Sequence, residues 1–219
     1  MLENKTTSEL NEKIEGYVKS YFGETTISNY EELIEKTSVA KRNIYLGAID
    51  GDTGSIIETA IRFYNQIDNE LDIPVEKRTP IKLFIDSPGG CVESALTICD
   101  ALKMSATPVW TINQGKAHSG GALVFLCGHE RYTYESATFL LHEGATRLGG
   151  YMDKSKFMDY AKFYDSLVLV MKDKILANTN ITEEEYELHK KDDWWFDAKE
   201  AIELKVADKI VTPDIYKTF

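Results

Sequence analysis

Ser119 is the residue that the sequence best equips to act as a nucleophile. It lies within the small-residue run Gly115–Gly121, where an expected strand passes into an expected helix. Small neighbours permit a sharp turn that projects the hydroxyl, and the amide N–H groups that follow face outward at the helix start, where they can stabilise an oxyanion. A serine that merely caps the helix is the alternative interpretation, and the motif alone favours it.

A second glycine turn favours a catalytic role for Ser119 over a simple helix cap. Asp86-Ser87-Pro88-Gly89-Gly90 also joins an expected strand to an expected helix. Its backbone could therefore bring another N–H group to the site of Ser119. An ordinary turn, in which glycine takes the left-handed conformation, is the alternative.

A serine hydroxyl needs a base to take its proton, and the chain has four histidines. His189 lies in a charged segment and is expected to be solvated, and His129 lies in an expected surface turn. His118 adjoins the serine, and neighbours along a turn usually point apart. His142, at the end of an expected strand, is the remaining candidate. A core histidine satisfied by a hydrogen bond is its alternative interpretation.

The base in turn needs an acid that fixes its tautomer. Three aspartates, Asp192, Asp193 and Asp197, crowd around the aromatic run Trp194-Trp195-Phe196. An aspartate shielded from water by aromatic rings is favoured over one in the open. That argument does not choose among the three.

Strands alternate with helices along the part of the chain that must position these residues. The pattern predicts strands at 42–47, 81–85, 108–112 and 138–141, a polar turn at 113–118, and helices after residues 53, 92, 119 and 154. Such alternation indicates an α/β fold with a mostly parallel sheet, whose active sites collect at the carboxyl ends of the strands. Both glycine turns and His142 are expected there.

Composition excludes several other classes of protein. With a formal net charge of -11, the chain is not expected to bind nucleic acid. No apolar run approaches the roughly 20 residues of a membrane helix, and the first residues lack the pattern of a signal peptide, so we expect a soluble cytoplasmic protein. Without an HExxH, CxxC, GxxxxGK[ST] or GxGxxG motif, no metal or cofactor is expected.

Residues 1–36 are expected to form a partly helical arm, and residues 37–219 a single domain.

Four segments, in this order, resemble motifs of the Clp proteolytic-subunit (ClpP) family of serine peptidases. They are Phe84–Gly90, Gly115–Ala122, Leu140–Gly144 and Asp193–Ala201. The resemblance runs from about residue 44 to residue 211. It implies a ClpP/crotonase-like spiral of βαβ units with a protruding handle helix at about 144–177.

The resemblance also implies roles for particular residues. Carried over by position, it implies Ser119 as nucleophile, His142 as base and Asp193 as orienting acid in an endopeptidase that works through an acyl-enzyme. It implies an oxyanion hole formed by the N–H groups of Gly90 and Gly120. It also implies a substrate groove lined by Gly89, Gly144, Gly149 and Gly150.

The family further implies polypeptide substrates, self-assembly into two stacked heptameric rings and an ATP-driven AAA+ unfoldase as partner. The chain departs from the family pattern at three places. Gly120 replaces the usual Met, Glu143-Gly144 replaces Gln-Pro, and Lys205 replaces a glycine. These departures indicate a changed substrate pocket.

Other functions remain as alternatives. A specialised or virus-encoded maturation protease would need no unfoldase, and a catalytically silent ring component would need no triad. A membrane-associated signal-peptide peptidase with a Ser–Lys dyad could use Lys116 but needs an anchor. A crotonase-type acyl-CoA enzyme would use the glycine turns without Ser119 or His142.

Overall fold

The computed structural model describes residues 37–144 and 153–219. The chain divides into two compact units, Met1–Asn43 and Ile44–Phe219. The expected arm at 1–36 lies outside the described residues, so that arm and its boundary with the domain at residue 37 stay predictions. The second unit contains every residue of the candidate site described below.

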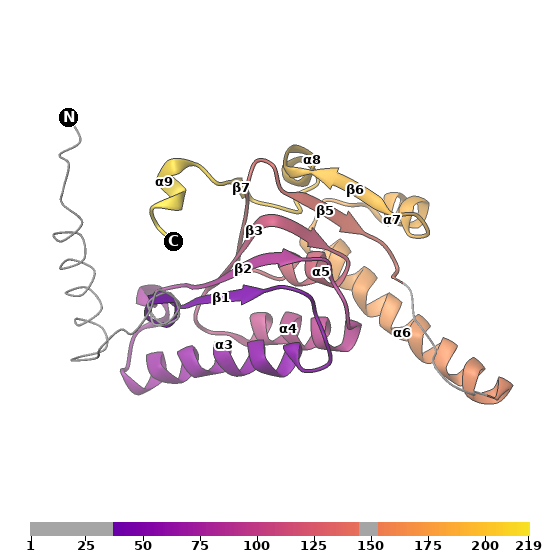
Figure 1. The fold of residues 1–219 in the computed structure, drawn as a ribbon, viewed down its shortest axis with the longest axis horizontal. Helices are drawn as coiled ribbons and strands as arrows, with labels where there is room; N and C mark the ends of the chain where they lie inside the picture. The colour runs from indigo at the N-terminus through magenta and orange to yellow at the C-terminus, as the bar shows by residue number, and fades with distance from the viewer. Residues whose placement is uncertain (1–36, 145–152) are drawn as a thin grey trace, which may run out of the picture. The chain divides into compact units, whose positions relative to one another are not determined.

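A seven-stranded sheet forms the centre of the second unit (Figure 1). Its path runs β1-β2-β3-β4-β7, and β5 branches from β3 and pairs with β6. The ladders β2–β3, β3–β4, β3–β5 and β4–β7 are parallel, whereas β5–β6 is antiparallel. The strands are β1 (Asn43–Leu46), β2 (Ile81–Ser87), β3 (Val109–His118), β4 (Glu130–Thr133), β5 (Thr138–Leu141), β6 (Trp194–Asp197) and β7 (Lys209–Ile210).

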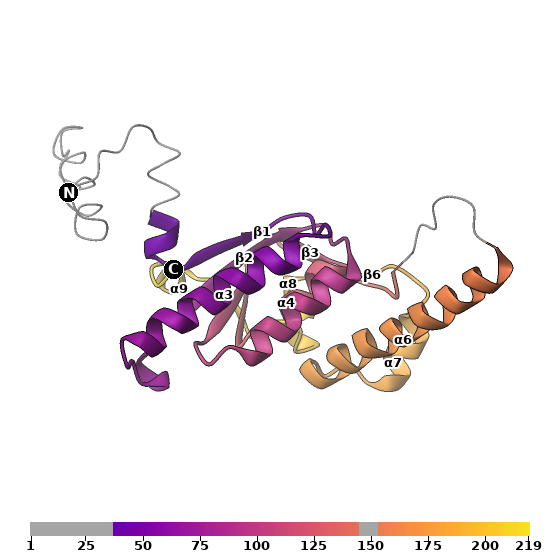
Figure 2. The same ribbon diagram turned by 90° about the horizontal axis from the view of Figure 1, so that it is seen from below.

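Helices connect these strands and cover the sheet. Helices α3 and α4 lie side by side against it, as two views agree (Figures 1 and 2). The α/β fold expected from the sequence is confirmed. The helices are α3 (Thr53–Glu70), the 3-10 turn η1 (Val75–Lys77), α4 (Val92–Met104), α5 (Gly120–Leu126), α6 (Lys154–Asn178), α7 (Glu183–His189), α8 (Ala198–Glu203) and α9 (Pro213–Tyr216).

Strand β2 and helix α5 are both deeply buried in the core. All seven residues of α5 are buried, and so are the first five residues of β2. A strand that is apolar on both faces is typical of a parallel sheet covered by helices on both sides. The short helix α5, with Ser119 immediately before it, is therefore held on all sides by the core.

The polar turn expected at 113–118 is wrong, because β3 continues through these residues. Its second half forms a new ladder with β5, in which Ala117 pairs with Phe139 and His118 with Leu140. The amide of the buried Asn113 donates to the Thr138 carbonyl over 3.0 Å. Pairing with a distant strand thus outweighs the local polarity of the segment.

The surface turn expected around His129 is present at residues 127–129, where His129 is exposed, but it is shorter than expected because β4 begins at Glu130. Arg131 is 7% exposed, and its guanidinium is paired with the Asp208 carboxylate over 2.9 Å. His129 accepts a hydrogen bond from the Val109 N–H through Nδ1. Arg131 can be buried in this strand because Asp208, which lies 77 positions later in the chain, neutralises its charge.

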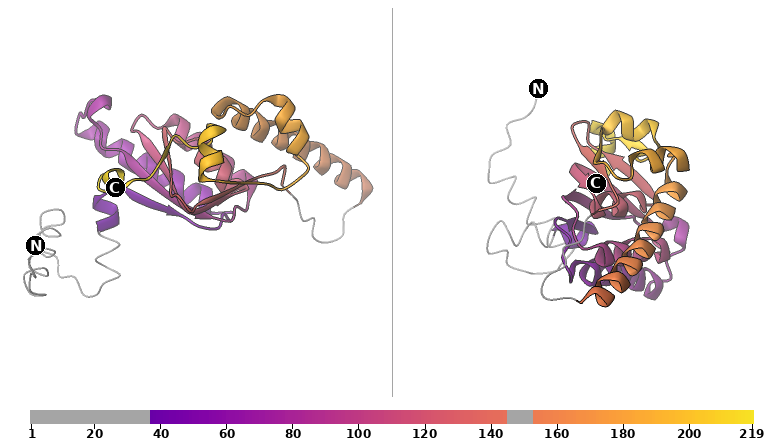
Figure 3. Two further views of the ribbon diagram at one scale, coloured as in Figure 1. Left: turned by 90° about the horizontal axis from the view of Figure 1, so that it is seen from above. Right: turned by 90° about the vertical axis from the view of Figure 1, so that its right-hand side faces the viewer.

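Helix α6 corresponds to the expected handle, and its first turns project past the sheet (Figure 3). Of its 25 residues, all described, Ile175 is the buried one. Several large apolar side chains on it face solvent: Phe157, Met158, Phe163, Leu169 and Val170. In the described part of the chain, no helix combines the length and apolar character needed to cross a membrane.

Candidate active site

Ser119 lies at the junction between β3 and α5, in a strained backbone conformation. Its φ is 55° and its ψ is -124°, a region that costs a residue with a side chain about 1–3 kcal/mol. Its side chain makes no hydrogen bond that caps α5. Instead, Ser119 Oγ lies 2.8 Å from His142 Nε2. The sequence alternative of a simple helix cap therefore does not describe this side chain.

Two contacts hold the Ser119 backbone in place. Its N–H donates to the Leu140 carbonyl of β5 over 2.9 Å. Gly89, with a φ of +90°, packs directly behind it, because a Cβ added to Gly89 would lie 2.7 Å from the Cβ of Ser119. Glycine is required at this position both by conformation and by space. Gly89 thus supports the serine from behind, and the substrate-groove role that the resemblance implies for it stays a prediction.

His142 follows the last residue of β5 and lies between Ser119 and Asp193. Its Nδ1 is 3.0 Å from the Asp193 Oδ1. A carboxylate only accepts hydrogen bonds, so Nδ1 carries the proton and Nε2 is free to accept the serine hydroxyl. The imidazole is oriented and basic toward the serine, as a general base must be.

Strand register brings Asp193 to His142. In the antiparallel β5–β6 ladder, Leu141 pairs with Trp194, so the next positions outward are His142 and Asp193. Asp197 caps α8, with Oδ1 accepting the N–H groups of Lys199 and Glu200. Of the three aspartates left open by the residues alone, Asp193 is the one paired with His142.

The expected shielding of the acid from water is wrong. The Asp193 side chain is 59% exposed, and that of His142 is 25% exposed. The aromatic residues beside Asp193 pack elsewhere: Trp194 stacks on His189 with ring centroids 4.3 Å apart, and Phe196 stacks on Phe139. His189 was expected to be solvated, and this stacking corrects that expectation.

His118 is directed away from the serine, as its position in the chain suggested. Its Nε2 is 2.9 Å from the Thr138 hydroxyl, and its ring meets Trp195 edge-on. Burial, followed by the charge of Lys116, lowers the pKa of His118. His118 Nε2 is thus engaged by the Thr138 hydroxyl.

The amide groups of Gly90 and Gly120 lie close together beside Ser119. Gly90 forms a parallel bridge in which Ile49 binds the residues on either side of it, so its own N–H points away from Ile49. Gly120 is the first residue of α5, where N–H groups lack partners inside the helix. A Cβ on Gly120 would lie 3.7 Å from the Gly90 nitrogen. The two donors therefore suit a shared oxyanion.

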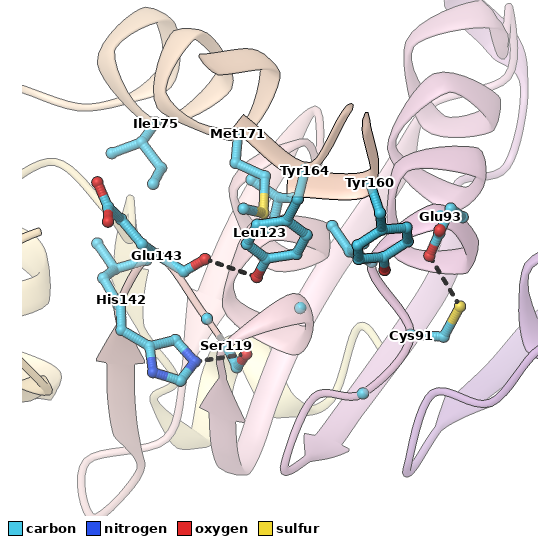
Figure 4. Close-up of a pocket in the computed structure, with 15 residues that line it drawn as sticks. Cys91, Glu93, Ser119, Leu123, His142, Glu143, Tyr160, Tyr164, Met171 and Ile175 are labelled. Carbon is cyan, nitrogen blue, oxygen red and sulfur yellow. Dashed lines mark hydrogen bonds between the residues drawn. The ribbon is translucent and has the colours of Figure 1, made fainter. Parts of the chain in front are cut away.

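A cavity of about 190 Å³ opens beside Ser119 and His142 (Figure 4). Helix α6 forms one wall with Tyr160, Tyr164, Met171 and Ile175, and Leu123 of α5 and Leu141 add apolar surface. Gly144 also lines it, as expected for a groove residue, whereas Gly149 and Gly150 lie outside the described residues. The sequence predicts a helix here but does not indicate that Tyr160, Tyr164, Met171 and Ile175 line a cavity.

No three histidine, cysteine, aspartate or glutamate side chains gather as a metal site within residues 37–144 and 153–219. The three cysteines are free thiols.

Comparison with known proteins gives one consistent family. A family model described as Clp protease matches residues 58–214. ATP-dependent Clp protease proteolytic subunit 2 of Pseudomonas aeruginosa is 31% identical over 141 residues, which are 62% of this chain and 67% of that protein. The ATP-dependent Clp protease proteolytic subunit of Lactococcus lactis subsp. cremoris is 30% identical over 167 residues, covering 74% and 78% of the two chains.

A solved structure has the same fold. A ClpP1 mutant from Listeria monocytogenes matches with a TM-score of 0.70 over 83% of this chain and 98% of that one. The two sequences are 20% identical over the match. At that identity, the likeness shows the fold alone.

Proposed function

Because this chain belongs to the Clp protease family, as a divergent member, we propose that it cleaves unfolded polypeptides with Ser119 as nucleophile, His142 as base and Asp193 as orienting acid. Serine-type peptidase activity follows from the family itself. The assignment to residues rests on one observation above all, the continuous hydrogen-bonded chain from Ser119 through His142 to Asp193.

The proposed reaction has two halves. His142 Nε2 takes the Ser119 proton as Oγ attacks the peptide carbonyl, and the oxyanion that forms accepts from the N–H groups of Gly90 and Gly120. The imidazolium then protonates the leaving amine, which leaves an acyl-enzyme. Water, deprotonated by His142, attacks the ester and restores the serine hydroxyl. Asp193 keeps the imidazole oriented and stabilises its charged form.

Substrate binding as an extended strand belongs to the same proposal. Gly144 lies at the edge of the cavity, where the backbone of β5 has just ended. A peptide laid along this edge would use main-chain hydrogen bonds and place one side chain in the cavity. Such binding reads little of the substrate sequence, which suits a peptidase of unfolded chains.

We further propose assembly into two stacked heptameric rings through α6, and feeding by an AAA+ unfoldase. Phe157, Phe163 and Leu169 on α6 are 49%, 49% and 60% exposed. Apolar surface of this kind is typical of a helix covered by another subunit. Cytoplasmic location is part of the same proposal.

Labelling with a fluorophosphonate probe tests the assignment of the nucleophile. Wild-type protein should be labelled on Ser119, and Ser119→Ala should not be labelled. Equal labelling of both proteins would place the reactive group elsewhere, and no labelling of assembled wild type would argue against an activated serine. Hydrolysis of short peptides without ATPase, but of folded proteins only with one, would support the unfoldase.

A further inference from the structure

The hydroxyl of Tyr164, on the α6 wall of the cavity, is bound to the chain that follows His142. The phenol donates to the Glu143 carbonyl over 3.1 Å, as the dashed line in Figure 4 shows. Met171 and Ile175 contribute only apolar surface to the same wall. Tyr164 thus connects α6 to the backbone immediately after the candidate base.

The contact fixes a segment that the sheet no longer holds. Strand β5 ends at Leu141, so the peptide groups of Glu143 lie beyond the regular ladder. The Glu143 N–H donates to the Lys190 carbonyl over 3.2 Å, and the Glu143 carbonyl accepts from Tyr164. With both its N–H and its carbonyl bound, Glu143 limits the movement of His142, its neighbour in the chain.

Gly144 provides the room for this hydroxyl. A Cβ added to Gly144 would lie 2.9 Å from the Tyr164 oxygen, closer than side chains tolerate. The φ of Gly144 is +83°, which proline cannot adopt, because its ring holds φ near -65°. The Gln-Pro pair usual at positions 143 and 144 of the family would therefore exclude this arrangement. Tyr164 and Gly144 form a matched pair in this chain.

The phenol remains a donor at neutral pH. Burial is the main cause that raises the pKa of Tyr164, and the nearby Tyr160, Glu143 and Glu93 raise it further. Each of these groups disfavours a phenolate. The hydrogen bond from the Tyr164 hydroxyl to the Glu143 carbonyl, which requires the phenol to be protonated, is thus preserved at neutral pH.

We infer that Tyr164 is a positioning residue for the reaction: by binding the Glu143 carbonyl above Gly144, it holds His142 at hydrogen-bonding distance from Ser119. The inference rests on the proposed function. It assigns to Tyr164 no contact with the reacting atoms. A displacement of about 1 Å at the base can cost on the order of 100-fold in rate.

The first test is Tyr164→Phe, which keeps the ring in the cavity wall and removes only the hydroxyl. We expect kcat on a fluorogenic peptide to fall about 5- to 100-fold, with KM changed by less than about two-fold. The rate of fluorophosphonate labelling should fall by the same factor as kcat. Tyr216→Phe, which removes a hydroxyl from a side chain that is 61% exposed, is the matched control and should leave both rates unchanged.

The second test couples the pair. Gly144→Ala should lower kcat by forcing its Cβ against the hydroxyl, and part of that loss should disappear in the Tyr164→Phe background. The combined loss should therefore be smaller than the product of the two separate losses. If the kcat losses of Gly144→Ala and Tyr164→Phe simply multiply in the double variant, the two residues do not act as a matched pair.

Other outcomes separate this inference from the proposed function. If wild type is labelled, Ser119→Ala is not, and Tyr164→Phe reacts at the wild-type rate, the inference is overturned while the nucleophile stands. A kcat loss that merely follows a lower unfolding midpoint or dissociation of the assembly would also overturn it. An unlabelled wild type would overturn both.

Discussion

Asp193 lies directly across the β5–β6 ladder from His142, one position beyond the last paired residues, Leu141 and Trp194. The 3.0 Å contact between Oδ1 and Nδ1 is thus set by strand register and not by enclosure. An exposed carboxylate can still orient an imidazole when the backbone fixes both. The acid of the candidate triad depends on a correctly paired edge strand.

Replacing this acid should disable the base without unfolding the protein. Asp193→Asn is expected to lower kcat roughly 10³- to 10⁴-fold, because the imidazole then loses its preferred tautomer. Peptide hydrolysis and the labelling rate measure the loss. Asp192→Asn, the same change at the exposed neighbouring position, should retain activity. Loss of activity in the Asp192 variant with a silent Asp193 variant would show that the acid is misassigned.

Restoring the residue usual in the family at position 120 should destabilise this protein. A Cβ on Gly120 would already lie 3.3 Å from the Ala95 Cβ and 3.4 Å from the Ile49 Cδ1. Gly120→Met should therefore lower the free energy of unfolding by about 1–3 kcal/mol, as overpacked cores do. Gly120→Ala should cost less. Urea unfolding measures both, and a Met variant as stable as wild type would mean that this part of the core adapts freely.

Lys205, where the family usually has glycine, adopts a left-handed backbone with a φ of 58°. Its ammonium also pairs with Asp208 over 2.9 Å, but the side chain is 52% exposed, so this pair contributes little. Lys205→Gly and Lys205→Ala both remove the ion pair, and only glycine relieves the backbone. We expect the glycine variant to be more stable than the alanine variant by about 1 kcal/mol in chemical denaturation. The reverse order would show that the backbone is unstrained there.

The Arg131–Asp208 pair should make stability depend on pH in the acid range. Burial alone would raise the pKa of Asp208, but hydrogen bonds from Arg131 and Lys205 outweigh it and lower the pKa to about 2, from 3.8. Because the folded value is the lower one, the pair stabilises the fold above about pH 4. That contribution, at most about 2 kcal/mol, is lost as the pH falls toward 2.

The corresponding variant is Asp208→Asn. It should cost about 2–4 kcal/mol near neutral pH, since it leaves Arg131 buried without its carboxylate, and it should flatten the loss of stability between pH 4 and pH 2. Asp214→Asn, at a 91% exposed carboxylate paired with Lys217, is the control and should change neither quantity. An unchanged acid limb in the Asp208 variant would refute the assignment.

Local patterns make Ser119 and His142 candidates for the nucleophile and the base, although the motif around Ser119 alone favours a helix cap. Ser119 stands out through its small neighbours, and His142 through its place at a strand end, because both signals lie within a few residues. The α/β alternation is likewise a local pattern. These are the parts of the fold that the structure confirms or brings together as expected.

Long-range pairing accounts for what the sequence did not reveal. The residues of β3 beyond Asn113 are polar and become strand only because β5 pairs with them. Arg131 becomes a core residue only because Asp208 lies beside it. Local argument does not separate Asp193 from Asp192 and Asp197, because the register of β6 against β5 decides which of them meets His142. Tyr164 is one of several residues at helical spacing in a long helix, so the sequence does not indicate its contact with the Glu143 carbonyl.

The β3–β5–β6 ladders also impose an order on how the candidate site is completed. The serine and the histidine are carried by β3 and β5, which are close in the chain, whereas β6 follows only after the whole of α6 and α7. If the proposed triad is correct, a growing chain contains Ser119 and His142 before it contains Asp193. Until the segment Trp194–Asp197 has been synthesised and paired with β5, the proposed acid cannot orient His142, so we expect the triad to be incomplete during synthesis.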